Sequence, residues 1–506
     1  MTRTPLAIFL ASVLFPPLGL ALLLLRPQTG YVKKAFGTLG IAILGVAHLF
    51  LFWGLRAELD GSGKWFVFTF HNPEKHYHRL EQTRAAMAEE RAPAAPEVVQ
   101  AAAPEPAPEP APTPPAKPAT PPYWTDYRGP ARDGLYAQTP ILTDWPAQGL
   151  DRLWRLPVGG GYASFVAANG KIYTIEQRRT REVVAAYDLE TGKELWTNSW
   201  EGLFREALGG DGPRATPTWH EGRIYALGAL GELRCLDAES GKVIWSKNIL
   251  RDNGAENITW GMAAAPLIVD EKVIVQPGGP NGKSIVAYHK LTGARVWSSL
   301  DDKAGYASPM LVTLAGVRQI VTMTGVRAVA VSPDDGRLLW EYPWRTAYDI
   351  NSAQPIVTGP NRVVISSGYG HGAALLEIEK SHESLSARPV WENTSMKNKF
   401  NSSVLYEGHI YGLDEGILAC VEVETGRRTW KGGRYGYGQL LLAEGHLIVL
   451  TEGGDVVLVK ANPERHEELA RFSAIEGKTW NTPAIVDGKL LVRNETQMAC
   501  FRLARN

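Results

Sequence analysis

Apolar and polar residues alternate in short runs through most of the chain from about residue 123 to residue 503. Runs such as Arg223–Leu227 and His409–Leu413 have the period of two that is typical of half-buried strands. Between the runs lie short segments rich in glycine, aspartate, threonine and serine, which are the residues of tight turns. This pattern predicts an all-β fold made of many short antiparallel strands.

Five segments of eleven residues repeat nearly the same phrase, with a small residue or cysteine first, glycine seventh and tryptophan eleventh. The glycine is expected because a tight turn between antiparallel strands needs a positive φ. A repeat of roughly 40 to 50 residues with strands between the copies predicts a β-propeller. The five segments are Ala186–Trp196, Cys235–Trp245, Ala287–Trp297, Ala330–Trp340 and Cys420–Trp430.

The tryptophan that ends each phrase is predicted to dock between neighbouring four-stranded sheets. Such a side chain buries about 150–250 Å² of aromatic surface. Two further tryptophans occupy matching positions in less regular repeats. The predicted docking residues are Trp154, Trp196, Trp245, Trp297, Trp340, Trp391 and Trp430.

This phrase resembles the tryptophan-docking motif of the pyrroloquinoline-quinone-like (PQQ-like) β-propeller family. That family includes quinoprotein alcohol dehydrogenases and the propeller lipoprotein of the outer-membrane assembly machinery. The segment Trp124–Gly134, followed by Leu153–Pro157, also resembles the opening of bacterial members. The resemblance covers about residues 123–503 and implies the fold, whereas propellers carry many functions on one frame.

Eight blades are predicted, with seven as the alternative. Eight inner-strand starts are recognised at Ser164, Thr216, Ala265, Ser308, Gln354, Ser402, Gln439 and Thr482. The last of them leaves too few residues for four strands. We therefore expect Asp151–Leu156 to supply the missing outer strand and so close the ring, which removes the open edge.

The first 122 residues differ in kind from the rest. Leu6–Leu25 and Ala35–Leu55 are each long and apolar enough to cross a bilayer of about 30 Å, so two transmembrane helices are predicted. A cleaved signal peptide is the alternative for the first segment. Arg26, Lys33 and Lys34 lie between the two segments, and by the positive-inside rule this loop is cytoplasmic.

Residues 91–122 are almost wholly proline, alanine, glutamate and threonine, with twelve prolines. This composition favours extended polyproline II, so the segment could reach up to roughly 90 Å. A short charged helix is predicted before it, from Leu80 to residue 90. The predicted domains are a two-helix membrane anchor at residues 1–60, a juxtamembrane helix and linker at 61–122, and the propeller at 123–506.

The charge and cysteine content exclude some functions. The chain has 53 basic and 53 acidic side chains, and this balance argues against nucleic acid as a ligand. Its three cysteines are scattered, and we expect buried thiols and no disulfide framework.

The inner-strand starts of a propeller converge on the mouth of its central channel, where a ligand site is expected. Aromatic faces with an arginine and several amides suit a flat, polar-edged ligand or a peptide loop. The alternative is that these side chains only fill the channel and cap strand ends. The predicted mouth residues, given as a possible cofactor-binding set, are Tyr162, Arg214, Trp260, Tyr306, Asn351, Asn401, Tyr437 and Trp480.

The family resemblance also implies what a quinoprotein dehydrogenase would need: PQQ with Ca²⁺, a stacking tryptophan, an acidic base and usually a pair of adjacent cysteines. This sequence has no adjacent cysteine pair and no Cys-x-x-Cys-His haem attachment motif. Asp349 is the carboxylate nearest a blade start, whereas Ca²⁺ prefers several oxygen ligands. We therefore expect no catalytic residue, metal or cofactor.

The sequence thus predicts a non-enzymatic, bacterial, protein-interaction scaffold in the inner membrane, multi-pass, with its propeller in the periplasm or outside the cell. Its expected partners are envelope or membrane proteins. The chain has no cysteine before Cys235 that could carry an N-terminal lipid. The alternatives are a propeller that binds a small quinone-like ligand, and a divergent PQQ-dependent oxidoreductase that uses PQQ with calcium.

Overall fold

A computed structural model describes residues 5–25, 30–52, 55–59, 66–70, 72–89, 123–206, 209–382 and 384–505. They form two compact units, Met1–His78 with Ala207–Gly210, and Arg79–Glu206 with Asp211–Asn506. We call the second unit the head. The predicted linker and Arg26 of the predicted cytoplasmic loop lie outside the described residues.

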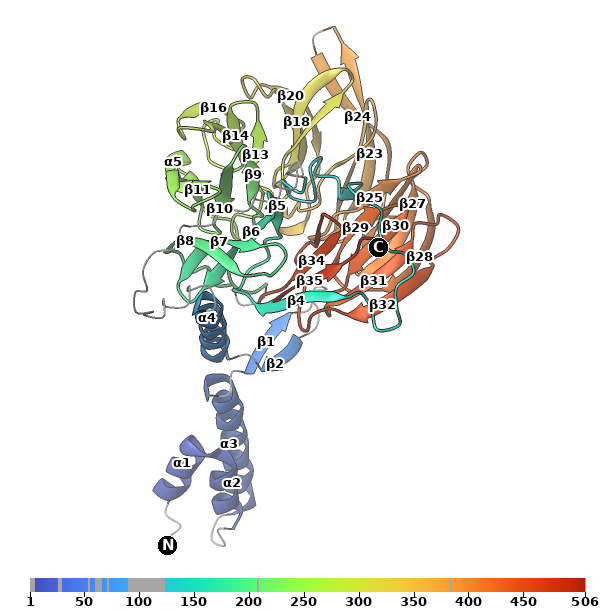
Figure 1. Cartoon of the computed structure of the whole chain (residues 1–506). Coiled ribbons are helices and arrows are strands. Elements are labelled where there is room, and N and C mark those ends of the chain that lie inside the picture. Colours follow the sequence, from blue (N-terminus) through green and yellow to red (C-terminus); the bar gives the residue numbers. More distant parts are fainter. Residues whose placement is uncertain are drawn as a thin grey trace, which may run out of the picture. The chain divides into compact units, whose positions relative to one another are not determined.

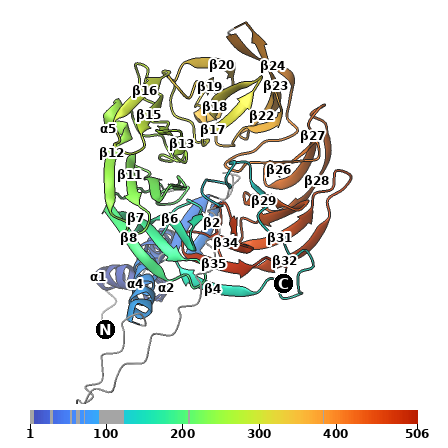
Figure 2. The same ribbon diagram turned by 45° about the horizontal axis from the view of Figure 1, so that its top comes forward.

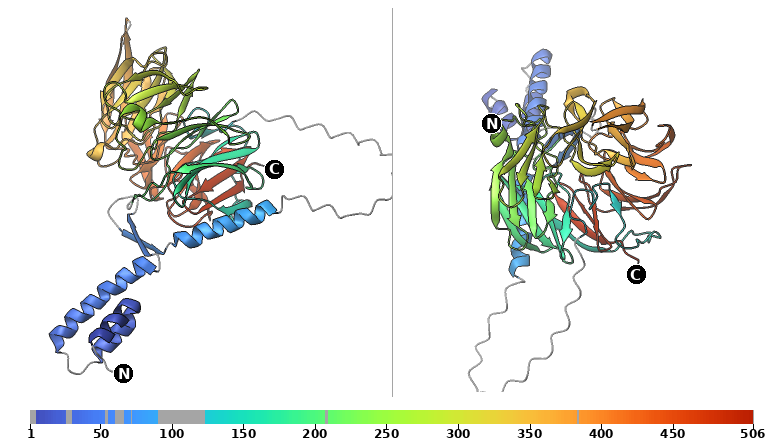
Figure 3. Two further views of the ribbon diagram at one scale, coloured as in Figure 1. Left: turned by 90° about the vertical axis from the view of Figure 1, so that its left-hand side faces the viewer. Right: turned by 90° about the horizontal axis from the view of Figure 1, so that it is seen from above.

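The described residues of the first unit include three helices and an antiparallel pair of strands. The helices are α1 (Pro5–Leu14), α2 (Pro16–Leu24) and α3 (Tyr31–Phe52), and strand β1 (Leu55–Leu59) pairs with β2 (Phe66–Phe70). Ile8, Leu23 and Ile41, one from each helix, pack together, and α2 lies beside α3 (Figures 1 and 3). Helix α4 (Pro73–Glu89) follows, and it contains the helix predicted at Leu80.

The prediction of two transmembrane helices is not confirmed, because the first segment is not one continuous helix. The helix stops at Leu14, Phe15 is extended with φ −149°, and α2 restarts at Pro16. Proline lacks an amide hydrogen and is suited to the first turn of a helix, so Pro16 and Pro17 divide the segment. The two pieces, of about 15 Å and 14 Å, are too short for a hydrocarbon core of about 30 Å.

One helix among the described residues is long and apolar enough to cross a membrane, over Tyr31–Phe50 of α3. A signal sequence near an N-terminus has the same length and composition. The predicted multi-pass arrangement is therefore not supported.

The head contains eight β-sheets arranged around a central axis, as Figure 2 shows. The predicted eight-bladed all-β propeller of four-stranded blades is confirmed. In blades 1 to 7 the chain runs from the inner strand to the outer one. The strands of blades 1 to 4 are β5 (Val166–Ala168), β6 (Lys171–Arg178), β7 (Arg181–Asp188) and β8 (Glu194–Glu201); β9 (Thr218–His220), β10 (Arg223–Leu227), β11 (Glu232–Asp237) and β12 (Val243–Asn248); β13 (Leu267–Val269), β14 (Lys272–Val275), β15 (Ile285–His289) and β16 (Arg295–Ser299); and β17 (Met310–Leu314), β18 (Val317–Met323), β19 (Arg327–Val331) and β20 (Leu338–Pro343).

Blade 8 closes the ring with a strand from the other end of the propeller sequence. Its fourth strand is β4 (Arg152–Pro157), which pairs antiparallel with β35 so that Trp154 lies opposite Cys500. The predicted closing strand is thus confirmed. The strands of blades 5 to 8 are β21 (Ile356–Gly359), β22 (Arg362–Ser367), β23 (Gly372–Ser381) and β24 (Ser384–Asn393); β25 (Val404–Tyr406), β26 (His409–Asp414), β27 (Ile417–Glu422) and β28 (Arg428–Arg434); β29 (Gln439–Ala443), β30 (His446–Leu450), β31 (Asp455–Lys460) and β32 (Glu468–Ser473); and β33 (Ala484–Val486), β34 (Lys489–Arg493), β35 (Gln497–Arg502) and β4.

The repeated tryptophans join consecutive blades. Trp245 of blade 2 is 9% exposed, and its Nε1 donates to the carbonyl of Lys290 in blade 3 at 2.8 Å. Trp154, Trp196, Trp297, Trp391 and Trp430 make the equivalent bond to the next blade. Trp340 donates instead to Gln319 of its own blade, and the next blade has the long β23–β24 hairpin in place of the glycine-containing turn.

The turn glycine lies under the tryptophan ring of the preceding blade. Gly241 has a φ of +70°, and a Cβ there would be 2.4 Å from Cε3 of Trp196. Glycine is therefore required both for the turn and for the close approach of the ring.

The segment that opens the propeller lies against the inner strands. The Arg132 side chain is 3% exposed and donates to the carbonyls of Ala265 and Pro309 at 3.3 and 2.9 Å, and also to that of Pro266. Arg128 donates to the Ser403 carbonyl at 2.8 Å. Strand β3 (Leu135–Tyr136) then adds a parallel strand to β29. Two buried arginines thus tie this segment to blades 3, 4 and 6.

Candidate functional site at the channel mouth

The loops that lead into the inner strands lie at one end of the channel, together with the turns between second and third strands. We call this end the channel mouth. The opposite end carries the Asp–Thr–Gly turns of the repeated phrases, such as Asp188–Lys193. The loops that lead into all eight blades contribute to the mouth. The mouth is therefore formed by residues that are far apart in the sequence.

Tyr162 and Trp480 form the first group at the mouth. Their ring centroids are 5.3 Å apart. The hydroxyl of Tyr162 donates to Glu495 at 2.8 Å. The ammonium of Lys478 lies over the Trp480 ring at 4.6 Å, and the guanidinium of Arg214 lies over the Tyr162 ring at 5.3 Å. Two cations therefore sit against one aromatic pair.

Tyr437 belongs to a second group that continues the first. Phe400 joins the two groups, with ring centroids 4.7 Å from Trp480 and 5.7 Å from Tyr437. Lys399 is 8% exposed and lies between Tyr369 and Tyr437, at 5.0 and 4.9 Å from the ring centroids. The contacts form a continuous aromatic and cationic surface over blades 5 to 8, 1 and 2.

Trp260 and Tyr306 form a third pair, from blades 3 and 4. Their ring centroids are 6.1 Å apart, and the backbone N–H of Trp260 lies 3.4 Å from the Tyr306 hydroxyl. Five predicted residues other than Arg214 are thus aromatic members of the mouth, with rings in contact in pairs or groups.

The two predicted asparagines are buried and form hydrogen bonds inside the head. Asn351 is fully buried and donates to the carbonyls of Thr324 and Trp344 at 2.9 and 3.0 Å. Asn401 is also buried and accepts from Asn398 at 3.2 Å. Asn351 caps backbone carbonyls and Asn401 accepts from a neighbouring amide. These contacts agree with the alternative prediction, in which the side chains at the mouth fill the channel and cap strand ends.

Sequence reasoning missed Tyr348, Tyr369, Lys399, Phe400 and Lys478. Tyr348 is 84% exposed and has a φ of +71°, in the loop that leads into blade 5. A non-glycine residue in this conformation is uncommon and, at an exposed aromatic, marks a candidate functional position. Tyr369 is flanked by Gly368 and Gly370, and this glycine-rich loop was a signal that could have found it.

Burial sets the ionisation of the mouth phenols. It raises the pKa of Tyr306 to about 12 and also raises that of Tyr369, to which the nearby phenols of Tyr306 and Tyr437 contribute. Burial lowers the pKa of Arg214, partly offset by Tyr162 and Glu495. At neutral pH these phenols remain neutral donors.

The mouth does not match the donor set expected for Ca²⁺ with PQQ. Glu452 accepts from the Trp480 indole at 2.9 Å and from the backbone of Tyr437 at 3.1 Å, and Glu495 accepts from Tyr162. Asp349 lies within 4 Å of Lys303 and Arg345. Within the described ranges, no three His, Cys, Asp or Glu side chains gather into a metal site. The expectation that no cofactor is bound stays a prediction.

Comparison with known proteins places the chain in a family. Residues 180–432, half of the chain, match the family described as outer membrane protein assembly factor BamB. The chain belongs to this family. The PQQ-like β-propeller resemblance seen in the repeated phrase is thereby confirmed.

Curated relatives agree with the BamB family match. The chain is 21% identical over 308 residues to the outer membrane protein assembly factor BamB of Bordetella pertussis, covering 59% of this chain and 72% of the relative. It is 22% identical over 320 residues to BamB of Burkholderia pseudomallei, covering 60% and 74%. A shorter match, 30% identical over 99 residues, is to the 1-butanol dehydrogenase (cytochrome c) of Thauera butanivorans, covering 19% of this chain and 14% of that protein.

Solved structures show the same fold. BamB from Moraxella catarrhalis superimposes with a TM-score of 0.50 and 14% identity, covering 70% of this chain and 99% of that one. A europium-containing methanol dehydrogenase gives a TM-score of 0.56 and 14% identity, covering 74% and 90%. At this identity the similarity concerns the fold alone.

Proposed function

We propose that this chain is a non-enzymatic scaffold of the bacterial cell envelope, anchored by α3 in the inner membrane with the propeller outside the cytoplasm. Its channel mouth binds a segment of another envelope protein. The family match supports a role among envelope proteins, because its BamB relatives are named as outer membrane protein assembly factors.

The composition of the mouth carries this proposal. Tryptophan, tyrosine and arginine dominate the energetic centres of protein interfaces. The mouth contains Trp260, Trp480, several tyrosines and Arg214, and it holds Tyr348 with 84% of its surface exposed. Ring contacts and ion–ring contacts hold the other side chains in place, so little side-chain entropy is lost when a partner binds.

The mouth carries charges of both signs. Arg214, Lys399 and Lys478 contribute cations, and Glu452 and Glu495 contribute carboxylates that accept hydrogen bonds from other mouth residues. A loop that carries aromatic and polar side chains would stack on the rings and pair with these charges.

Site-specific crosslinking tests the proposal. A photoreactive residue in place of Tyr348 should capture a defined envelope protein in membranes of the native host. The same residue in place of Asp334, in the exposed turn of blade 4 at the opposite end, is the matched control and should not capture it. Equal capture at both positions, or none at Tyr348, would contradict a binding surface at the mouth.

The second candidate is a propeller that binds a small quinone-like ligand or acts as a divergent PQQ-dependent dehydrogenase. The 99-residue match to a butanol dehydrogenase and the methanol dehydrogenase fold favour it. Titration of the purified full chain with PQQ and Ca²⁺ separates the two candidates. Saturable binding with a raised melting temperature would support this second function over the scaffold.

A further inference from the structure

The second half of helix α4 lies on the head at the boundary between blades 8 and 1. Its shielded residues are Leu80, Thr83, Arg84 and Met87, which share one helix face at spacings of three and four. Leu80 is 2% exposed. Arg79–Glu89 belong to the same compact unit as the propeller, although residues 90–122 separate them from it in the sequence.

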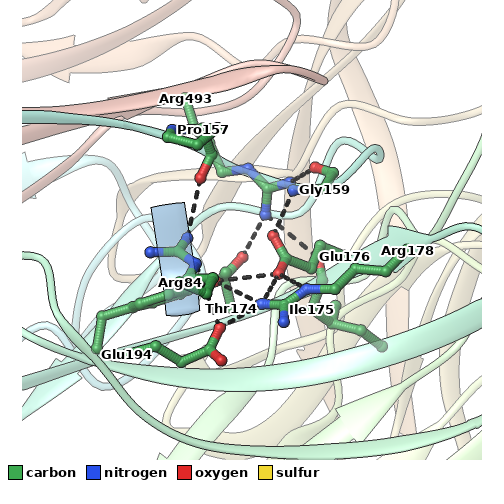
Figure 4. Close-up of polar contacts among 10 residues, drawn as sticks. Arg84, Pro157, Gly159, Thr174, Ile175, Glu176, Arg178, Glu194 and Arg493 are labelled. Atoms are coloured by element: carbon green, nitrogen blue, oxygen red, sulfur yellow. Dashed lines mark hydrogen bonds and ion pairs between the residues drawn. The ribbon is translucent and has the colours of Figure 1, made fainter. Parts of the chain in front are cut away.

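Arg84 makes the central contact of this docking (Figure 4). Its side chain is 9% exposed, and Nη2 donates to the carbonyl of Pro157 at 2.9 Å. The guanidinium lies 4.7 Å from the centroid of the Tyr187 ring, and Nε is 3.5 Å from a carboxylate oxygen of Glu194. At the edge of the contact, Glu81 accepts two hydrogen bonds from Arg179, at 2.8 and 3.1 Å.

The pocket that receives Arg84 already has balanced hydrogen bonds and charges. Buried Glu176 accepts from the backbone N–H of Gly159 at 2.7 Å, from the Tyr187 hydroxyl at 3.0 Å and from Arg178. Arg493, also buried, donates to Thr174 at 2.6 Å and to the Gly159 carbonyl at 2.9 Å. Two carboxylates, Glu176 and Glu194, thus face two guanidiniums without Arg84.

The electrostatics of Glu176 agree with this balance. Burial alone would raise the pKa of Glu176, but Arg178, then Arg493 and then Arg84 lower it to about 2. Of these three cations, Arg84 lowers the pKa of Glu176 the least. The head therefore does not need Arg84 in order to keep this carboxylate ionised.

The contact that α4 makes with the head is mostly polar. Apart from Leu80, the shielded face is polar or only half-buried, and Arg84 Nη1 lacks a hydrogen-bond partner among the described residues. Moving a guanidinium out of water carries a desolvation cost that one carbonyl, one ring and one carboxylate offset in part.

We propose that α4 is a reversible latch, which docks on the head through Arg84 and can leave the pocket without unfolding the propeller. While α4 is docked, the head begins at Arg79. Release adds residues 79–122 to the sequence that joins the first unit to the propeller. This regulation goes beyond the proposed scaffold function.

Crosslinking of the full chain in detergent tests the latch. Glu81→Cys with Arg179→Cys places two thiols across the contact edge, while Cys235, Cys420 and Cys500 are buried. A short bismaleimide should join α4 to blade 1 within one chain. Adding Arg84→Glu should reduce this product at least about tenfold, because the new carboxylate would face Glu194.

Arg79→Glu is the matched control, with the same charge change at an exposed position of the same helix. It should change the yield by less than about twofold. The melting temperature of the head should stay within about 2 °C in both variants. Unchanged crosslinking in the Arg84 variant, or a head that melts earlier with it, would overturn the latch. A product that joins two chains would assign the pocket to a second copy and would also overturn it.

Hydrogen exchange of the unmodified chain tests reversibility separately. Amides of Arg79–Glu89 should exchange at least about 100-fold faster than those of β6 and β7, which form the pocket, because local opening requires less free energy than global unfolding. Equal protection of α4 and these strands would show that the helix is a fixed part of the head.

Discussion

Replacing Trp245 by alanine should destabilise the head by about 4 kcal/mol. The indole is 9% exposed and its Nε1–H donates to the Lys290 carbonyl at 2.8 Å. Burial of about 150–250 Å² of aromatic surface at about 25 cal/mol per Å² corresponds to roughly 4–6 kcal/mol. The lost hydrogen bond contributes about 1 kcal/mol, and relaxation of neighbouring side chains recovers a part, so the expected loss falls in the range of about 3–5 kcal/mol known for such truncations.

Urea unfolding of the full chain, followed by circular dichroism, measures this loss. Trp245→Phe is the matched variant, since it keeps most of the ring contact with Gly293 but removes the hydrogen bond. It should cost about 1–2 kcal/mol. A loss below about 1 kcal/mol for the alanine variant would refute docking between blades as the role of the repeated tryptophan.

Three further predictions concern stability. Gly241→Ala should cost at least about 2 kcal/mol more than Gly222→Ala, because both have a positive φ but only the first would press a Cβ against Trp196; equal losses in thermal unfolding would contradict this packing. Burial raises the pKa of Glu182 to about 7; because this folded-state value lies above the unfolded one, stability should fall as pH rises from about 5 to about 8, by up to about 3 kcal/mol. A pH series should show this fall for the wild type and a flat profile for Glu182→Gln, and a fall that persists in the variant would exclude Glu182 as its source. Arg132→Met should cost about 3–5 kcal/mol, since it leaves inner-strand carbonyls unpaired; a melting temperature equal to that of the wild type would contradict its role in holding the opening segment.

The repeated phrase predicted the fold because its information is local. Glycine at the seventh position specifies a positive φ within a few residues, and the tryptophan at the eleventh bonds to the next blade in four of the five copies. The sequence also predicted the fourth strand of blade 8, because the eighth repeat has too few residues for four strands. The first membrane span was not confirmed: hydropathy favoured one long helix over Leu6–Leu25, whereas the helix breaks at Pro16.

The candidate site was predicted only in part. Tyr162, Trp260, Tyr306, Tyr437 and Trp480 were identified from their positions beside the inner-strand starts, and their rings do lie at the mouth. The same rule also named Asn351, whose buried amide donates to the backbone.

Two features could not be found from the sequence. Lys399 and Tyr369 meet only because separate blades converge on one axis. Residues 90–122 separate Arg84 from the propeller in the sequence. No local pattern near Arg84 indicates that Glu194 or Tyr187 is its neighbour. Long-range placement of this kind is a property of the fold and leaves no local pattern.

The affinity of the mouth for its captured partner tests the central claim most directly. The partner protein identified by crosslinking from Tyr348 should bind the purified full chain saturably. Tyr348→Ala combined with Lys478→Glu should weaken that binding at least about tenfold, while Asp334→Ala at the opposite end should leave it unchanged. Equal affinities for all three chains would contradict the mouth as the surface through which this propeller acts.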